Sequence, residues 1–198
     1  YGDWSSDVCS SDLDVAAPPV ADRIAAVAVV GPRARRSLGK DGLARWLATV
    51  RPGGCLFLPG CGSEAWPEGV DVSTSAASAE GLVVRPVPPA GIGTWTHQYG
   101  GPDNATFAGE TLAGARSCRE FTVQWLGRPG PRFQSDRGNR KPAPLFANGR
   151  LFAQGLDRFM ALDAYNGAVL WHLEVPDSRR FNIRHDAANW CCDDERLF

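Results

Sequence analysis

The first half of the chain alternates between strand-like and helix-like hydrophobic patterns. The apolar run Asp22–Val30 has the length of a buried strand, and Gly31-Pro32 ends it. Apolar residues then recur at three- and four-residue spacing, as on one face of a helix, at Leu43, Trp46, Leu47 and Val50. Arg51-Pro52-Gly53-Gly54 ends that helix, and Cys55–Leu58 begins another strand. The order strand, helix, strand predicts a βαβ-type unit.

The pattern weakens before the middle of the chain. Ser73–Ala79 is small and polar, which predicts a flexible connection, and Leu82–Val84 predicts one more strand. Pro86-Val87-Pro88-Pro89 has the composition of a semi-rigid linker. We therefore expect a domain boundary near residue 90.

Short strands separated by turn signals fill the C-terminal third. Asn148-Gly149 and Asn166-Gly167 supply the residues that tight hairpins need. Between and around these turns, the pattern predicts four antiparallel strands at residues 143–147, 150–154, 158–164 and 168–174. A further strand is expected at Phe121–Leu126.

Two markers in this region share one period. Trp125 and Trp171 lie 46 residues apart, and so do the segments Gly149–Phe152 (GRLF) and Glu195–Phe198 (ERLF). A period of roughly 40–50 residues suits a propeller blade of four strands. A single blade leaves its faces and edges uncovered. The chain is therefore expected to be a fragment of a longer protein, holding about one and a half to two blades.

A family resemblance follows from the residues at the centre of this repeat. Ala161–Trp171 (ALDAYNGAVLW) resembles the A-L-D-A-x-T-G-x-x-x-W core of pyrroloquinoline-quinone (PQQ) propeller repeats, with Asn166 in place of the usual Thr. The tryptophan of that family docks between adjacent blades, although a ligand-stacking role is the alternative. The resemblance implies structural repeat positions at Ala161, Leu162, Asp163, Ala164, Gly167, Trp171 and Trp125. Asp163 is expected to bond the amides of its turn.

The resemblance implies two kinds of parent protein. One is a quinone-dependent dehydrogenase with PQQ and Ca²⁺ in a central funnel, in a periplasmic or extracytoplasmic location. The other is a scaffold that binds proteins without catalysing a reaction. The residues do not choose between them. No catalytic residue, metal ligand or cofactor is assigned to the fragment itself, and its expected partners are the remaining blades and other proteins.

Trp95–Thr106 resembles the segment that enters a first blade.

A second resemblance concerns residues 14–90. The R-P-G-G segment before a strand resembles the late part of the Rossmann-like fold of S-adenosylmethionine-dependent methyltransferases. This gives an alternative reading, a methyltransferase remnant fused to a protein-binding propeller. Leu58–Ala65 imitates the cofactor loop of that family as G-x-G-x-x-A, but Glu64 adds negative charge and Pro67 disrupts a following helix. A surface turn is favoured there.

The N-terminus has a separate origin in our interpretation. Asp3–Leu13 (DWSSDVCSSDL) resembles the translation of a sequencing adapter, and a natural disordered start is the alternative. The predicted organisation is a non-native or disordered segment at 1–13, an α/β Rossmann-like remnant with its linker at 14–90, and incomplete all-β propeller blades of four antiparallel strands at 91–198.

Composition and charge narrow the candidate functions. The net charge is −1, so no basic field favours nucleic acid, and no apolar run reaches the roughly 18 residues of a membrane span. No signal peptide is visible. None of the six cysteines shows C-x-x-C spacing. Cys191-Cys192 align by the repeat with Leu145-Phe146, which predicts core packing. The alternative is the strained disulfide of some quinoprotein dehydrogenases.

Overall fold

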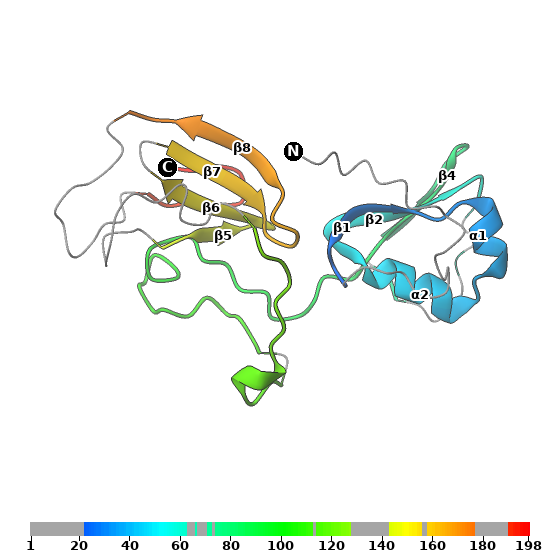
Figure 1. Ribbon diagram of the computed structural model, residues 1–198, viewed down its shortest axis with the longest axis horizontal. Coiled ribbons are helices and arrows are strands. Elements are labelled where there is room, and N and C mark those ends of the chain that lie inside the picture. Colours follow the sequence, from blue (N-terminus) through cyan, green and yellow to red (C-terminus); the bar gives the residue numbers. More distant parts are fainter. Residues whose placement is uncertain are drawn as a thin grey trace. The chain divides into compact units, whose positions relative to one another are not determined.

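The chain folds into two compact units, each with its own sheet (Figure 1). The computed structural model describes residues 22–62, 66, 71–72, 74–112, 114–127, 143–155, 158–176 and 190–198. The units are Tyr1–Pro88 and Pro89–Phe198. The described chain is mostly β, with two four-stranded sheets and few helices, and its strands close into neither a barrel nor a propeller. The adapter-like residues 3–13 lie outside the described residues.

The first unit contains the predicted βαβ arrangement. Its elements are β1 (Ala25–Val29), α1 (Pro32–Ser37), α2 (Lys40–Ala48), β2 (Val50–Pro59), β3 (Thr74–Ala77) and β4 (Gly81–Arg85). The sheet order is β1-β2-β4-β3. β1 and β2 are parallel, and β4 runs antiparallel to both of its neighbours, β2 and β3. A helical crossover is what joins two parallel strands of one sheet.

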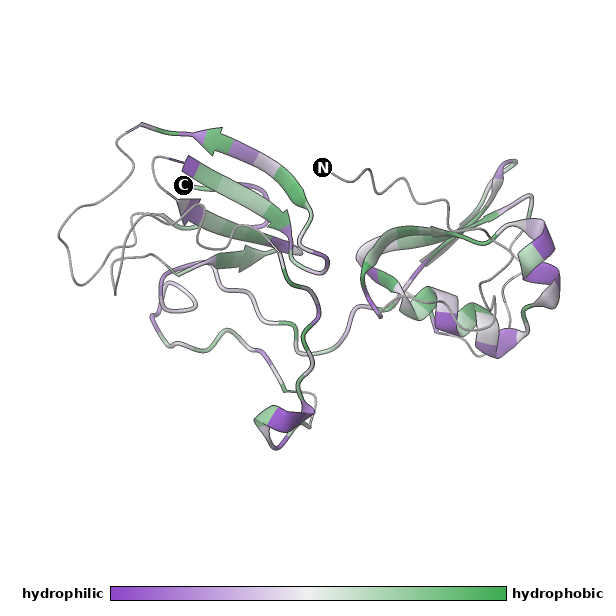
Figure 2. Cartoon of the chain, in the orientation of Figure 1, coloured by the Kyte–Doolittle hydropathy of each residue, from purple (hydrophilic) through white to green (hydrophobic). Residues whose placement is uncertain are grey.

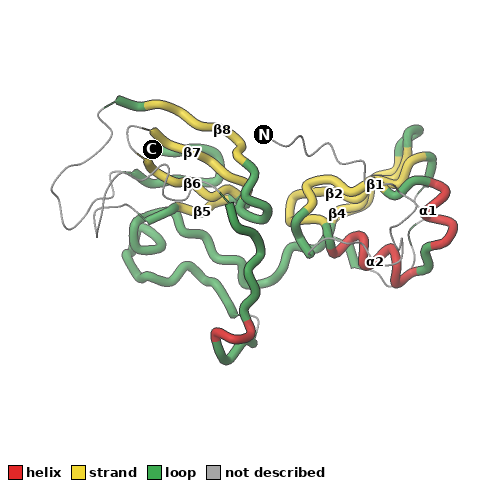
Figure 3. Tube along the Cα trace, viewed as in Figure 1, coloured by secondary structure: helices red, strands yellow, loops and turns green. Residues whose placement is uncertain are grey.

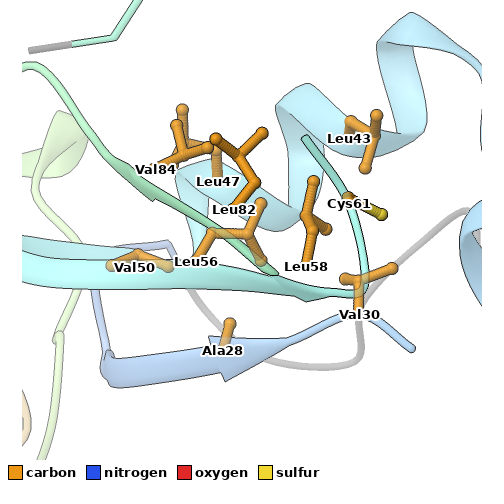
Figure 4. Close-up of a cluster of buried hydrophobic side chains, with 10 residues drawn as sticks. All are labelled: Ala28, Val30, Leu43, Leu47, Val50, Leu56, Leu58, Cys61, Leu82 and Val84. Atoms are coloured by element: carbon orange, nitrogen blue, oxygen red, sulfur yellow. The ribbon is translucent and has the colours of Figure 1, made fainter. Parts of the chain in front are cut away.

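The core of this unit lies between α2 and one face of the sheet (Figure 4). Leu43 and Leu47 face the sheet from α2, because they lie one helical turn apart. Alternate residues of the strands meet them, and the fully buried ones include Leu56, Leu58 and Leu82. This two-residue alternation is what a strand with one covered face requires.

The R-P-G-G segment differs from its prediction. α2 ends at Ala48 and β2 begins at Val50, so the segment lies inside the strand and does not end the helix. One residue of β1, Ala26, opposes four residues of β2, Arg51–Gly54, because Ala25 pairs with Val50 and Val27 with Cys55. The extra residues form a bulge, which glycine permits through its left-handed backbone, with φ +77 at Gly53.

Residues 74–77 also correct the sequence prediction. The segment expected as a flexible connection forms β3, which pairs antiparallel with β4. A tight turn joins the two strands, where the Ser78 amide donates to the Gly81 carbonyl at 2.9 Å. Alanine is depleted in strands and threonine is enriched, so local propensity is weak here and the pairing with β4 decides the conformation.

The second unit contains the four antiparallel strands predicted near its end. They are β5 (Leu145–Ala147), β6 (Arg150–Gly155), β7 (Arg158–Asp163) and β8 (Val169–Glu174). Each strand pairs with the next one in sequence, in the order β5-β6-β7-β8. Asn148 and Gly149 both have positive φ in the turn between β5 and β6, as the Asn-Gly signal predicts.

The strand expected at Phe121–Leu126 is not formed. Residues 121–127 follow the short 3-10 helix η2 (Cys118–Glu120) as irregular backbone (Figure 3). Val123 and Leu126 are 72% and 90% exposed. A strand needs a neighbour to satisfy its backbone groups. Residues 121–127 have no such neighbour among the described residues.

Candidate functional site

The turn between β7 and β8 is held by a closed set of hydrogen bonds. Asp163 is 3% exposed, and its Oδ1 accepts a bond from the Tyr165 amide at 3.0 Å. Its backbone amide donates to the Ala168 carbonyl, and its carbonyl accepts from the Gly167 amide, both at 2.8 Å. Asn166 Oδ1 accepts from the Ala168 amide at 2.9 Å. Asp163 therefore has the turn-bonding role expected from the sequence.

Trp125 lies on this turn from 39 residues earlier in the chain. Its indole Nε1 donates to the Ala164 carbonyl at 2.9 Å. Its ring covers Gly167, where an added Cβ would lie only 2.5–2.8 Å from three ring atoms. Gly167 also has φ +74. Glycine is thus needed twice at this position, for its left-handed backbone and for the close approach of the ring.

Trp171 has a different environment, although it lies 46 residues after Trp125. It pairs with Ala161 across β7 and β8, and its ring centroid lies 6.0 Å from that of Phe152 at 46°. Its side chain remains 39% exposed. Trp125 therefore packs on a hairpin turn that lies later in the chain. Trp171, in contrast, is a residue of β8 and packs on Phe152 of the same sheet.

The hairpin of β5 and β6 is repeated near the end of the chain. Leu145 pairs with Phe152 in the first copy. The residues 46 positions later, Cys191 and Phe198, exchange two backbone hydrogen bonds at 3.1 and 2.8 Å. Cys192 likewise bridges Leu197. The period found in the sequence is thus also a period of backbone pairing.

The hairpin of residues 190–198 covers one face of the β5–β8 sheet. Trp190 is 6% exposed and its ring centroid lies 5.4 Å from that of Phe159 on β7. The two turns also meet, because Asn148 Nδ2 and Arg150 Nη1 both lie 3.3 Å from the Asp194 carbonyl that accepts their bonds. The buried residues of this contact are Leu145, Ala147, Phe152, Ala161, Trp190 and Cys192. The hairpin of residues 190–198 therefore packs against the β5–β8 sheet through both side chains and turns.

Asp193 stabilises the turn of the second hairpin. Its Oδ1 accepts bonds from the amides of Glu195 and Arg196 at 2.7 and 2.6 Å. These two hydrogen bonds hold the pKa of the Asp193 carboxyl below its usual value, because they favour the ionised form.

The two adjacent cysteines are both free thiols in the structure. Cys192 is buried, as its core register predicts, and Cys191 is partly buried. Burial, with smaller contributions from Cys191, Asp193 and Asp194, raises the pKa of Cys192 to about 11. A thiol in this environment is a small apolar core residue with little thiolate at neutral pH.

This environment predicts the order of cysteine modification. At pH 8 we expect iodoacetamide to alkylate the exposed Cys118 well before Cys192, since the thiolate is the reactive form and Cys192 is both protonated and buried. Peptide mass spectrometry over a time course measures both rates. Equal rates at the two sites would contradict the buried position of Cys192.

The residues described here do not fit a PQQ and calcium site. No group of three or more His, Cys, Asp or Glu side chains lies together among the described residues. Ca²⁺ takes six to eight oxygen ligands, so a donor set of this kind would be required. His97 bonds the neighbouring Thr96 hydroxyl at 2.9 Å, His172 lies on exposed β8, and His185 lies outside the described residues.

The loop that imitates a cofactor-binding turn is described only in part. Gly60 turns the chain after β2 with φ +65, and its amide donates to the Glu80 carbonyl at 2.9 Å. Cys61 is buried against the core of the first unit. A cofactor-binding loop of this kind would continue into a helix at residues 63–70, and residues 63–65 and 67–70 lie outside the described residues.

The sequence predicted no contact for Trp190, and for Trp95 it predicted only a place in the segment that enters the first blade. Trp95 exchanges backbone bonds with Phe146 at 2.8 and 2.7 Å, which extends the sheet beyond β5. A signal for Trp190 was present, since it directly precedes residues that align with β5.

Among the described residues, no helix has both the length and the apolar character needed to cross a membrane.

A scan against family models and searches of curated proteins and of solved structures found no match to this chain.

Proposed function

We propose that residues 89–198 are part of a PQQ-repeat, quinoprotein-like β-propeller that serves as a scaffold or ligand-binding module. The observation that carries this proposal is the docking of Trp125 on the next repeat, through the Ala164 carbonyl and the face of Gly167. A tryptophan that bridges two repeats is the feature that the resemblance implies for this family.

Contacts of the β5–β8 hairpins with segments that precede and follow them support the same interpretation. Trp125, from the preceding repeat, contacts the turn between β7 and β8. The hairpin that pairs Cys191 with Phe198, from the following repeat, packs against the sheet. Repeat proteins are stabilised by such contacts between nearest neighbours. A flat indole with a single N–H donor suits a seam of this kind, since one face is apolar and one bond fixes its position.

The structural roles of these residues are compatible with both kinds of parent protein, because a scaffold and a dehydrogenase both need repeats that pack on each other. Asp163, Gly167 and Trp125 bond or pack on backbone, and each serves the turn itself. In a dehydrogenase, the cofactor site would need residues beyond those described. A scaffold needs the repeats and their exposed loops alone.

Extension by the next repeat tests this proposal. We expect the gene to continue past Phe198 with further repeats of 46 residues, and we expect the indole N–H of Trp171 to become protected when the next repeat is added. ¹⁵N-tryptophan NMR with hydrogen exchange measures this protection, and the Trp125 indole serves as the internal control, since it is already bonded. A stop codon directly after Phe198, or a Trp171 indole that stays unprotected in the longer protein, would overturn the propeller proposal.

A second candidate function is supported by the topology of the first unit. We propose as the alternative that this unit is the C-terminal remnant of an S-adenosylmethionine-dependent methyltransferase fused to a protein-binding propeller. Parallel β1 and β2 are followed by β4, which inserts antiparallel between β2 and β3. Large α/β sheets often combine parallel strands with an antiparallel one, so this strand order agrees with a Rossmann-like remnant. This is an argument from fold alone.

The sequence upstream of the chain decides this second proposal. A strand with an acidic end followed by G-x-G-x-G, within about 150 residues before the first unit, would support a methyltransferase, because one domain of that length holds the cofactor loop. A continuous reading frame of that length without the motif would remove it.

A further inference from the structure

β8 presents an exposed, apolar edge. It is the outermost strand of the order β5-β6-β7-β8, and all six of its residues are exposed. Leu173 is 56% exposed, and Val169 and Leu170 are similar. Figure 2 shows hydrophobic colouring on β8 at both ends of the strand. Backbone–backbone bonds link β8 to β7, and no other described strand pairs with it.

The usual protection of an edge strand is weak in β8. Proteins block such edges with proline, lysine or inward charges. β8 (VLWHLE) contains neither proline nor lysine, and its one charge, Glu174, lies at the end in an ion pair with Arg158 at 3.1 Å. A bulge near Leu170 twists the beginning of the strand, whereas Trp171–Glu174 keeps a regular register. The regular part is therefore open to a further strand.

The opposite edge of the same sheet is closed. Trp95 exchanges two backbone bonds with Phe146 of β5, at 2.8 and 2.7 Å. Among the described residues, the sheet thus has one open edge. If the same edge of a second copy pairs with it, neither copy keeps an open edge on this sheet, so assembly through β8 ends at two copies.

We propose that two copies of this chain pair through β8, edge to edge and antiparallel, across a twofold axis. Antiparallel pairing places the two Glu174 residues at opposite ends of the paired segment, which avoids like-charge repulsion. Exposed leucines of one strand come beside those of the other. The open edge is a feature of the β5–β8 sheet itself, so this proposal does not rest on the propeller assignment.

The dimer is expected to be weak. A short strand pair buries less than the roughly 1,200 Å² of a standard stable interface. Association should therefore be reversible and concentration-dependent, with a dissociation constant in the micromolar range. Backbone bonds between the strands give the contact its register, and side chains on both faces add apolar area.

Sedimentation velocity of the full chain, from low to several hundred micromolar, tests the pairing. We expect a monomer–dimer equilibrium in which Leu173→Lys raises the dissociation constant at least tenfold, since a charge on an edge strand opposes pairing. Leu126→Lys and Val29→Lys are matched controls, because both side chains are exposed and lie outside β8, and neither should change the constant. Hydrogen exchange of β8 amides should slow as the concentration of the wild-type chain rises.

Three results would overturn the proposal. They are a monomer at every concentration, a dimer that Leu173→Lys leaves unchanged, and a dimer that Val29→Lys abolishes. A monomer would leave the edge to a strand of another protein. If Leu173→Lys fails to fold, Leu173→Gln is the variant to use, with exchange of β6 and β7 amides as the folding control. Loss of the dimer would not affect the docking of Trp125, so failure here is distinguishable from failure of the propeller proposal.

Discussion

Replacing Gly54 with alanine is expected to destabilise the first unit by about 3 kcal/mol, at the upper end of the cost of overpacking a core. An added Cβ would lie 2.5 Å from the Ala26 carbonyl oxygen, 2.8 Å from Val50 Cγ1 and 3.0 Å from the Arg51 carbonyl oxygen. Two of these three atoms belong to backbone, so they cannot rotate away. The parallel pairing of β1 with β2 would have to open.

Amide hydrogen exchange on β1 and β2 is the direct measurement, because it reports opening of this sheet apart from the second unit. Gly39→Ala is the matched control. Gly39 precedes α2 with φ −78, and an added Cβ would meet nothing within 4 Å. That substitution should change stability by less than about 1 kcal/mol. Equal exchange rates in the Gly54→Ala and Gly39→Ala variants would show that the bulge does not bring Gly54 against β1.

Gly54 also shows where sequence reasoning succeeds and where it stops. Hydrophobic periodicity located β1, α2 and β2, since period and length are local properties. Arg51-Pro52-Gly53-Gly54 predicts the end of a helix, because proline and glycine usually end elements. The bulge that they form instead depends on how β1 lies against β2, and this register is a tertiary property that no local pattern contains.

In the second unit, the local pattern predicted the turns and the strand order correctly and one strand wrongly. A 46-residue period and the Asn-Gly turns predicted the order of β5 to β8, because turn residues and repeats are both visible in one sequence. The same period predicted a strand at Phe121–Leu126 that is not formed. The period predicts a strand at Phe121–Leu126 because the residues 46 positions later overlap β8. A strand also needs a neighbouring strand to pair with, and among the described residues none pairs with Phe121–Leu126.

The candidate site was predicted as a set of residues and not as a contact. Asp163, Gly167 and Trp125 were all assigned structural roles from the resemblance. Their meeting in one place could not be derived from spacing, since Trp125 reaches the turn through an irregular segment. The docking also explains why glycine occupies position 167, which the turn type alone explains only in part.

Replacing Gly167 with alanine is expected to cost the second unit about 3 kcal/mol. The left-handed backbone at φ +74 accounts for about 1–2 kcal/mol of this. The remainder comes from the Trp125 ring, which the new Cβ displaces together with its bond to the Ala164 carbonyl. Gly109→Ala is the matched control, since Gly109 has φ +82 but open space around it, and only the backbone cost of about 1–2 kcal/mol should remain there.

A double-mutant cycle separates the ring from the backbone. Trp125→Ala alone should cost about 2 kcal/mol, below the value for a fully buried tryptophan, because the side chain is partly exposed. With the ring already absent, Gly167→Ala should add only its backbone cost, so the double variant should be more stable than the sum of the single variants by about 1–2 kcal/mol. Urea denaturation of the four proteins measures the coupling. Strict additivity would mean that Trp125 does not cover Gly167 in solution, and the docked seam, with the propeller proposal that depends on it, would then have to be abandoned.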